Sequence, residues 1–502
     1  MKEKSERYTH ILKYTGLFGG VQGLSILVGI VRTKLVAVLL GTEGVGLASL
    51  FNSTIKLVSD STNLGISISA VREISDAYEK NNAERLSHSI MLIRSWSMLT
   101  ALFGMMVCLL ASPLLNRWTF TWGDHTLHFV LLSPVVAMLA VTAGETAVLK
   151  GTRQLRSLAT ISVYNVIVSL IATVPLYYVW HVAAIVPALF LVGFLQMILT
   201  IGYSYRLYPL RLSFSRSLLG EGLGMVWLGI AFVIAGIMGS GADFAIRAFL
   251  NNVDSIDVVG LYSAGYVMTM TYAGMVFSAM DTEFFPRISG IPKLGEKLND
   301  AVNSQIEICI LLVSPMLVFF QTFLPILLPV LYTGKFMPAL GMMQVMVIAM
   351  FIRAVKLPIS YLPLARGDSR SYLLMEACYD VFVVIAVVYG FRMAGLTGTG
   401  YGIMAASVFD FLMLFFYMRW KYRYVMSATV YRYIGLHFPL ILLSFAATFA
   451  PSSWIYWTTG ILLSIISGAI SLRILYTKTQ IWERLNQSWA RYGKSDGVGG
   501  GV

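Results

Sequence analysis

The sequence predicts an all-α polytopic membrane protein with about fourteen transmembrane helices. Of its 502 residues, 57% are apolar and only 12% are charged, and the mean hydropathy is +0.73. Soluble domains carry about 25% charged residues, so this chain has too few charges to cover a water-facing surface. The third observation is a series of apolar stretches, each long enough to cross a bilayer about 30 Å thick as a helix of about 20 residues.

The apolar stretches are expected to be helices, because a helix satisfies its own backbone hydrogen bonds inside a membrane. They lie at 14–39, 46–70, 87–112, 127–149, 157–179, 183–204, 223–250, 259–282, 303–325, 338–364, 371–391, 398–418, 430–450 and 455–476. The polar segment 1–13 precedes them. After them, 477–502 carries apolar residues on one helical face, as an amphipathic tail on a membrane surface does: Ile481, Trp482, Leu485 and Trp489.

Lysine and arginine are concentrated in alternate connections between these stretches. Only Arg117, Lys335 and Arg392 lie in the remaining connections. Cytoplasmic loops carry most basic residues in membrane proteins, so the alternation predicts an even number of spans with both termini in the cytoplasm. One cytoplasmic connection is expected to hold Arg72, Lys80, Arg85 and Arg94. Because the basic clusters are short and scattered, the net charge of +12 indicates topology and not a nucleic-acid partner.

Cysteine and histidine give no sign of a metal site or cofactor. Cys108, Cys309 and Cys378 lie inside apolar stretches, far apart in sequence and without the spacing of zinc ligands. His125 and His128 form an HxxH sequence in an outer loop close to two tryptophans. An aromatic belt at the membrane interface explains this loop better than a metal site does.

An internal repeat appears when the start of the chain is compared with its middle. Arg32 is followed by Val45-Gly46-Leu47-Ala48-Ser49, and Arg247 by Val259-Gly260-Leu261-Tyr262-Ser263. In each copy an arginine lies late in one span and a VGLxS sequence opens the next. The copies are about six predicted spans apart, an even number, which predicts two halves with the same orientation, related by an axis along the membrane normal.

Six basic residues fall inside predicted spans: Arg32, Lys34, Lys56, Arg247, Arg353 and Lys356. A charge in the middle of a membrane costs about 2.5 kcal/mol or more, so each needs a partner, a route to the interface or a water-filled cavity. Asp60 and Asp243 stand one helical turn from Lys56 and Arg247 and could neutralise them. The other four lack an acidic residue at helical spacing. A positive cavity suits an anion, with phosphate or pyrophosphate favoured and an anionic sugar or small organic anion left open.

Acidic residues inside the spans are candidates for coupling to Na⁺ or H⁺. Glu376 and Asp380 share a helical face, and like charges one turn apart favour protonation of one of them. Asp60 and Asp243 are further candidates. Helix packing through hydrogen bonds is the alternative for these residues.

Two segments carry a family resemblance. The first is Arg32-Thr33-Lys34 followed by Leu40-Gly41-Thr42-Glu43-Gly44-Val45-Gly46-Leu47, and the second is Asp243-Phe244-Ala245-Ile246-Arg247-Ala248-Phe249-Leu250 leading to Val259-Gly260-Leu261-Tyr262-Ser263-Ala264. In these segments the chain resembles the oligosaccharide flippases of the polysaccharide transport family. That family lies within the multidrug/oligosaccharidyl-lipid/polysaccharide exporter superfamily.

The resemblance implies two six-helix lobes, 14–205 and 206–419, around a central cavity that opens alternately to either side, with two further helices in 420–476. The implied cargo is an undecaprenyl-pyrophosphate-linked oligosaccharide, such as an O-antigen, capsule or exopolysaccharide repeat unit. It would move from the cytoplasmic to the outer leaflet of the bacterial cytoplasmic (inner) membrane. By the same resemblance, Arg32, Lys34, Lys56 and Arg247 would bind the pyrophosphate. Arg353 and Lys356 are added to this set for their charge and depth.

Two other classes of protein compete with this interpretation. An ion-coupled small-molecule or drug exporter would share the architecture, but its cavity would favour acidic or aromatic residues. A membrane enzyme of the same pathways would need a catalytic segment outside the bilayer, and the outer connections here are short. For the flippase that the resemblance implies, the expected partners are the lipid-linked oligosaccharide, the bilayer, and a polysaccharide polymerase or other assembly proteins.

Overall fold

The computed structural model of the chain describes residues 2–80, 82–272 and 295–479, together with Phe277, Phe284, Ile288, Ser289 and Ile291. All regular secondary structure in this part of the chain is helical. Ten helical stretches within it are long and apolar enough to cross a membrane. The predicted class, an all-α integral membrane protein, is therefore confirmed. The predicted amphipathic tail lies almost entirely outside the described residues.

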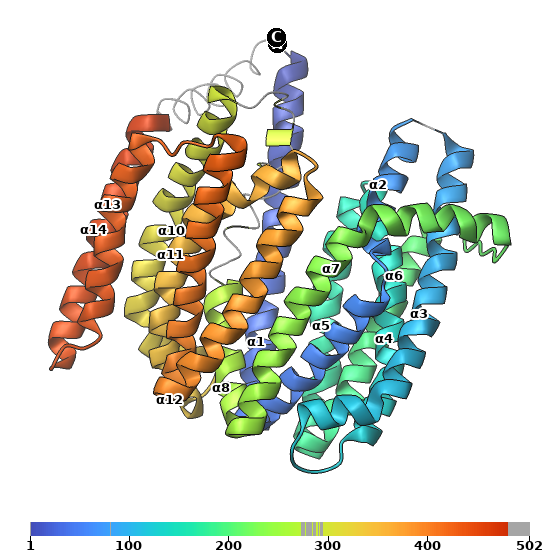
Figure 1. Ribbon diagram of the computed structural model, residues 1–502, viewed down its shortest axis with the longest axis horizontal. Coiled ribbons are helices and arrows are strands. Elements are labelled where there is room, and N and C mark those ends of the chain that lie inside the picture. Colours follow the sequence, from blue (N-terminus) through green and yellow to red (C-terminus); the bar gives the residue numbers. More distant parts are fainter. Residues whose placement is uncertain are drawn as a thin grey trace, which may run out of the picture. The chain divides into compact units, whose positions relative to one another are not determined.

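The helices follow the predicted apolar stretches along the chain (Figure 1). The first part forms α1 (Lys2–Thr62), α2 (Ile66–Glu79), α3 (Ala83–Thr119), α4 (Thr126–Gly151), α5 (Leu155–Trp180), α6 (Ile185–Leu207), α7 (Arg216–Val253) and α8 (Ile256–Tyr266). A π-helical turn follows at Val267–Tyr272. The remainder forms α10 (Glu296–Leu331), a 3₁₀ helix (Gly334–Ala339), α11 (Leu340–Ala365), α12 (Ser369–Tyr422), α13 (Ala428–Ala447) and α14 (Ser453–Thr479).

Two helices are long enough for more than one crossing. Helix α1 has 61 residues and α12 has 54, and at about 1.5 Å per residue each exceeds twice the thickness of a bilayer. Each is interrupted where the backbone leaves the helical region, at Gly41 with φ 67° and at Gly395 with φ 57°. Glycine adopts such positive φ values without steric cost. Two pairs of predicted stretches are therefore joined by a kink and not by a loop.

One predicted stretch, 46–70, is not a single helix. Helix α1 ends at Thr62, and α2 begins at Ile66. Between them Leu64 and Gly65 have φ values of 53° and 70°, which are incompatible with a continuing right-handed helix. Hydropathy does not report backbone direction, so the break was not predicted.

The chain divides into two compact units. The first comprises Met1–Tyr266, Ile326–Leu340 and Ser369–Gly402, and the second comprises Val267–Pro325, Gly341–Asp368 and Ile403–Val502. In the first unit, α4 packs against α3 and α6, while α1 packs against α5, α7 and α8. The lobes predicted at 14–205 and 206–419 stay a prediction.

The two copies of the internal repeat meet within the first unit. Ser49 of α1 and Ser263 of α8 are separated by 214 positions, and their hydroxyl oxygens lie 2.6 Å apart. Gly46 and Gly260 each lie against the backbone of the other segment, where a Cβ atom would overlap a carbonyl oxygen. The VGLxS sequences therefore have a physical role, because glycine is the residue that permits this close approach of two helices.

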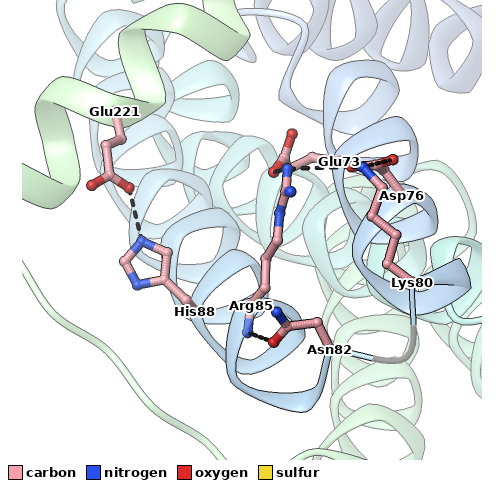
Figure 2. Close-up of polar contacts among 7 residues, drawn as sticks. All are labelled: Glu73, Asp76, Lys80, Asn82, Arg85, His88 and Glu221. Carbon is pink, nitrogen blue, oxygen red and sulfur yellow. Dashed lines mark hydrogen bonds and ion pairs between the residues drawn. The ribbon is translucent and has the colours of Figure 1, made fainter.

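Polar contacts join α2, α3 and α7 at one end of the first unit (Figure 2). The Asn82 side chain accepts a hydrogen bond from the Arg85 backbone N–H and caps α3. Arg85 also pairs with Glu73 and Asp76 of α2. His88 of α3 lies 2.8 Å from the carboxylate of Glu221 on α7. Beneath them, buried apolar residues of α2, α3, α4 and α7 form one cluster: Ala70, Ile74, Ile90, Leu92, Ile93, Ala147, Val148 and Leu218.

In the second unit, the side chain of Asn303 on α10 fixes the connection between α12 and α13. It donates to the Val425 carbonyl at 2.9 Å and accepts from the Tyr424 hydroxyl at 2.9 Å. Its oxygen also accepts from the Ser427 N–H at 3.1 Å. Ser427 in turn caps α13 by accepting a hydrogen bond from Val430 N–H. One buried amide thus holds the residues that immediately precede α13.

Candidate substrate and ion-coupling sites

Arg32 lines a cavity of about 190 Å³ among α1, α5 and α6 of the first unit. We call it the α1–α5–α6 pocket, and its lining is Arg32, Asn165, Val166, Val168, Ser169, Val192, Leu195 and Gln196. Arg32 carries the one charge in this lining. Its Nε is buried and has no hydrogen-bond partner among the described residues. The pocket therefore presents a positively charged donor that the described protein does not neutralise.

Lys34 lies on the other side of α1 from Arg32. Two residues along a helix correspond to a rotation of about 200°. The ammonium of Lys34 donates to the carbonyl of Pro329 at 2.6 Å and to that of Tyr332. These carbonyls lie at the carboxyl end of α10, where the helix leaves acceptors without intrahelical partners and carries partial negative charge. The structure thus separates Lys34 from Arg32 and gives it protein partners.

Arg247 is surrounded by protein groups on all sides. It forms an ion pair with Asp243, one turn earlier on α7. Its Nε donates to the Ser49 hydroxyl at 2.8 Å and to the Ser263 hydroxyl at 3.2 Å. Its guanidinium also lies over the Tyr262 ring at 5.8 Å, a cation–π distance. The side chain is only 8% exposed, so contact with cargo requires an exchange of these partners.

Lys56 is exposed, in contrast to Arg247. The nearby Asp60 carboxylate contacts the Ser240 hydroxyl of α7, and Lys56 acts on it electrostatically without a direct ion pair. Among the residues described, no hydrogen bond or ion pair involves the Lys56 ammonium. Its charge is therefore available to a ligand.

The acidic candidates gather beside one stretch of α7. The Asp380 carboxylate of α12 lies against Gly239, and Asp243 follows one turn later on the same helix. Glu376 and Asp380 both act electrostatically on Tyr372 of α12. In the described ranges no three His, Cys, Asp or Glu residues come close enough to hold a metal ion. Their role in coupling to Na⁺ or H⁺ stays a prediction.

Arg353 and Lys356 lie on α11 in the second unit. Lys356 forms an ion pair with Asp410 of α12, which is only 4% exposed. Its charge is thus neutralised from another helix, although its own span holds no acidic residue at helical spacing. Spacing within one span does not reveal a pair made across two helices. For Arg353, which is half-buried, the described part of the chain provides no hydrogen bond or ion pair.

A buried ionic network joins α3, α4 and α6. The spacing of charged residues along the sequence did not predict it. Arg94 was expected in a cytoplasmic connection, but it lies within α3 and is buried. Its Nε donates to Glu145 at 2.9 Å, and Nη1 donates to the Pro209 carbonyl at 2.9 Å. Ser204 and the Tyr205 ring complete its surroundings. Arg94 is therefore a packing residue of the first unit.

The HxxH loop forms an aromatic cluster. His125 and His128 approach to 3.0 Å between their Nδ1 atoms. His125 also lies 4.2 Å from the ring centroid of Phe120 and 5.0 Å from that of Trp122. Among the described residues, no group of three His, Cys, Asp or Glu side chains close enough to hold a metal ion includes these two histidines.

Comparisons with known proteins relate the sequence and the fold of this chain to a family. The model of the family described as polysaccharide biosynthesis protein matches residues 11–291. No curated protein sequence matches at a significant level. Among solved structures, lipid II flippase MurJ in an inward closed conformation is 15% identical with a TM-score of 0.64, covering 92% of this chain and 99% of that chain.

Two further solved structures share the fold. An inward-facing multidrug resistance MATE family transporter of the MOP superfamily is 16% identical with a TM-score of 0.62, covering 79% of this chain and 94% of that chain. A MOP superfamily transporter from Pyrococcus furiosus, described by the reverse polarity of its binding pocket, is 14% identical with a TM-score of 0.57. The match covers 80% of this chain and 93% of that one.

These structures show that the chain has the fold of MOP superfamily transporters. The family match covers more than half of the sequence and includes Arg32, Lys34, Lys56 and Arg247. The family resemblance carried by the segments that begin at Arg32 and at Asp243 is thus confirmed. The chain belongs to the polysaccharide biosynthesis protein family.

Proposed function

We propose that this protein is an alternating-access flippase that carries a polyprenyl-pyrophosphate-linked oligosaccharide across the bacterial cytoplasmic membrane, from the inner to the outer leaflet. About fourteen helices in two six-helix lobes with two further helices, and cytoplasmic termini, belong to this proposal. The protein acts as a transporter and not as an enzyme. Family membership and the fold support this class of function.

The observation that carries the proposal is positive charge without acidic partners inside the spans. Among the described residues, no ion pair involves Arg32, Lys56 or Arg353. A charge without an ion-pair partner is costly inside a membrane span, so these side chains are retained against a stability penalty. A cargo with negative charges relieves that penalty each time it binds. A cationic drug would increase it, which disfavours the exporter alternative.

The three other basic residues inside the spans already have partners within the protein. Lys34, Arg247 and Lys356 already contact protein acceptors, so each would have to exchange a partner to contact cargo. We assign the pyrophosphate first to Lys56 and Arg353, with Lys34, Arg247 and Lys356 joining after such an exchange. An exchange of this kind provides a way to couple cargo binding to a conformational change.

Ion coupling is the second element of the proposal. Asp60, Asp243 and Asp380 lie beside the same stretch of α7, and Glu376 lies one turn before Asp380. Protonation or Na⁺ binding at these carboxylates would change the net charge around Asp243 and Arg247. We propose that this change drives the return of the empty carrier.

The test is binding and transport with purified full-length protein. Native mass spectrometry would compare a polyprenyl-pyrophosphate-linked oligosaccharide with the same lipid lacking both phosphates. We expect a phosphate-dependent complex that is weakened at least about tenfold by Lys56→Ala or Arg353→Ala. Arg117→Ala is the matched control, because Arg117 is exposed at the end of α3.

Transport in proteoliposomes gives the second measurement. Lys56→Ala and Arg353→Ala should abolish transport, whereas Arg353→Lys should retain part of it because the charge remains. Equal binding of both lipids, with normal transport by both alanine variants, would contradict the flippase proposal. That result would favour an exporter and assign the basic residues to helix packing.

A further inference from the structure

The α1–α5–α6 pocket contains three buried polar atoms without partners. They are Arg32 Nε, Asn165 Oδ1 and Ser169 Oγ, none of which has a hydrogen bond among the described residues. Ser169 is only 3% exposed. Buried polar groups are almost always hydrogen-bonded, so three unpaired polar atoms on residues that line one cavity indicate a ligand. Gln196 adds a fourth polar group from α6.

The orphan atoms define what that ligand must offer. Arg32 can only donate hydrogen bonds, the Asn165 oxygen can only accept, and the Ser169 hydroxyl can do both. The ligand therefore needs an anionic acceptor at one end and hydroxyl donors beside it. The rest of the lining is aliphatic, three valines and a leucine, which suits the C–H edges of a sugar ring.

Size and charge restrict the ligand further. A cavity of about 190 Å³ is smaller than the 300–1,000 Å³, roughly, of sites for drug-sized ligands. It accommodates one monosaccharide and not an oligosaccharide. Its single positive charge matches a single carboxylate. Pyrophosphate carries more negative charge and, when ionised, offers no donor to Asn165.

We propose that the α1–α5–α6 pocket binds one acidic sugar residue of the cargo glycan. The carboxylate accepts hydrogen bonds from Arg32, and ring hydroxyls bond Asn165, Ser169 and Gln196. This inference rests on the proposed flippase function, because a glycan must reach the pocket during transport. It adds a binding site for one sugar of the glycan. It also gives Arg32 a role different from that of the residues assigned to pyrophosphate.

The first test is equilibrium binding of glucuronate, glucose and inorganic pyrophosphate to purified full-length protein by isothermal titration. Glucuronate should bind saturably, and Arg32→Gln should weaken it at least about tenfold through loss of charge-assisted hydrogen bonds. Ser169→Ala should also weaken it. Ser162→Ala is the matched control, since Ser162 is an exposed serine of α5 bonded to the Leu158 carbonyl. Arg32→Lys keeps the charge and should still prefer glucuronate to glucose.

Two outcomes would overturn the proposal: glucuronate binding no tighter than glucose, or pyrophosphate displacing glucuronate at equal concentration. A transport assay separates this inference from the function on which it rests. Two lipid-linked substrates would be compared, with and without one uronic acid in the glycan. If wild type and Ser169→Ala carry both at equal rates, the flippase function stands and the pocket proposal fails. If neither lipid is carried, the proposed function itself fails.

Discussion

The guanidinium of Arg94 donates to the carboxylate of Glu145 at 2.9 Å, and the two side chains are only 2% and 3% exposed. They link α3 to α4 and, through the Pro209 carbonyl, to the segment that follows α6. A buried ion pair adds little net stability, but the loss of one partner leaves an unpaired buried charge. The pair therefore makes the packing of these helices sensitive to single substitutions.

Arg94→Met should destabilise the first unit by about 3–5 kcal/mol, because Glu145 then keeps a charge without a partner. The double variant Arg94→Met/Glu145→Leu should recover most of that loss. Unfolding of the purified variants in detergent, followed by circular dichroism, measures both. A double variant as unstable as the single one would show that the polar contacts to Pro209 and Ser204 dominate instead.

Gly46→Ala and Gly260→Ala should each destabilise the protein by about 1–3 kcal/mol. The added methyl group would overlap a backbone carbonyl of the neighbouring segment, which cannot move aside as a side chain can. Gly29→Ala is the control, because among the described residues, apart from its own helix backbone, no atom lies within 4 Å of its Cβ position. This substitution in a helix should stabilise by about 0.5–1 kcal/mol. Similar melting temperatures for all three variants would contradict the close approach.

A cysteine pair at Ser49 and Ser263 should form a disulfide under mild oxidation. The hydroxyl oxygens lie 2.6 Å apart, and a disulfide requires sulfurs about 2.05 Å apart. The native cysteines Cys108, Cys309 and Cys378 would first be replaced by alanine. If α1 and α8 separate here during the transport cycle, the oxidised protein should lose transport and a reductant should restore it. Full transport by the cross-linked protein would show that this contact persists throughout the cycle.

Acid should loosen the loop around His125. Burial, reinforced by the neighbouring His128, lowers the pKa of His125 below its ordinary value, which is about 6.5. The folded loop then binds fewer protons than the unfolded loop, so its stability is full above about pH 6.5 and declines as pH falls below that value. Hydrogen exchange of residues 120–128 should accelerate below this pH. His125→Phe, which keeps the aromatic packing, should remove the dependence, and an unchanged pH profile in this variant would assign the effect elsewhere.

Sequence patterns within one segment predicted the structure of that segment well. The helical class follows from apolar stretches whose backbone must be satisfied internally. Helical spacing allowed two ion pairs, of which Asp243 and Arg247 form one, whereas Lys56 and Asp60 interact without a direct ion pair. The VGLxS repeat predicted two equivalent segments, which meet at Ser49 and Ser263. In each case the prediction rests on residues within one segment, or on a pattern that is repeated along the chain.

Contacts between distant helices could not be predicted in the same way. Lys356 and Asp410 are 54 positions apart, and no spacing rule connects residues on different helices. Arg94 was grouped with the basic residues of a connection, and its partner, Glu145, lies on another span. The orphaned oxygens of Asn165 and Ser169 became visible only once α5 and α6 enclosed a cavity with Arg32. Helix packing determines these sites, and the sequence alone does not specify it.

The contact between Gly46 and Gly260 is reciprocal. Each glycine contacts the backbone of the other segment, and Ser49 meets its own counterpart, Ser263. Reciprocal contacts of this kind define the interface of a twofold symmetric dimer, in which the same patch serves both partners. The present chain therefore holds, within one polypeptide, the contact geometry of a twofold symmetric interface. Arg247 donates to both serines of this contact, whereas Arg32 lines a pocket.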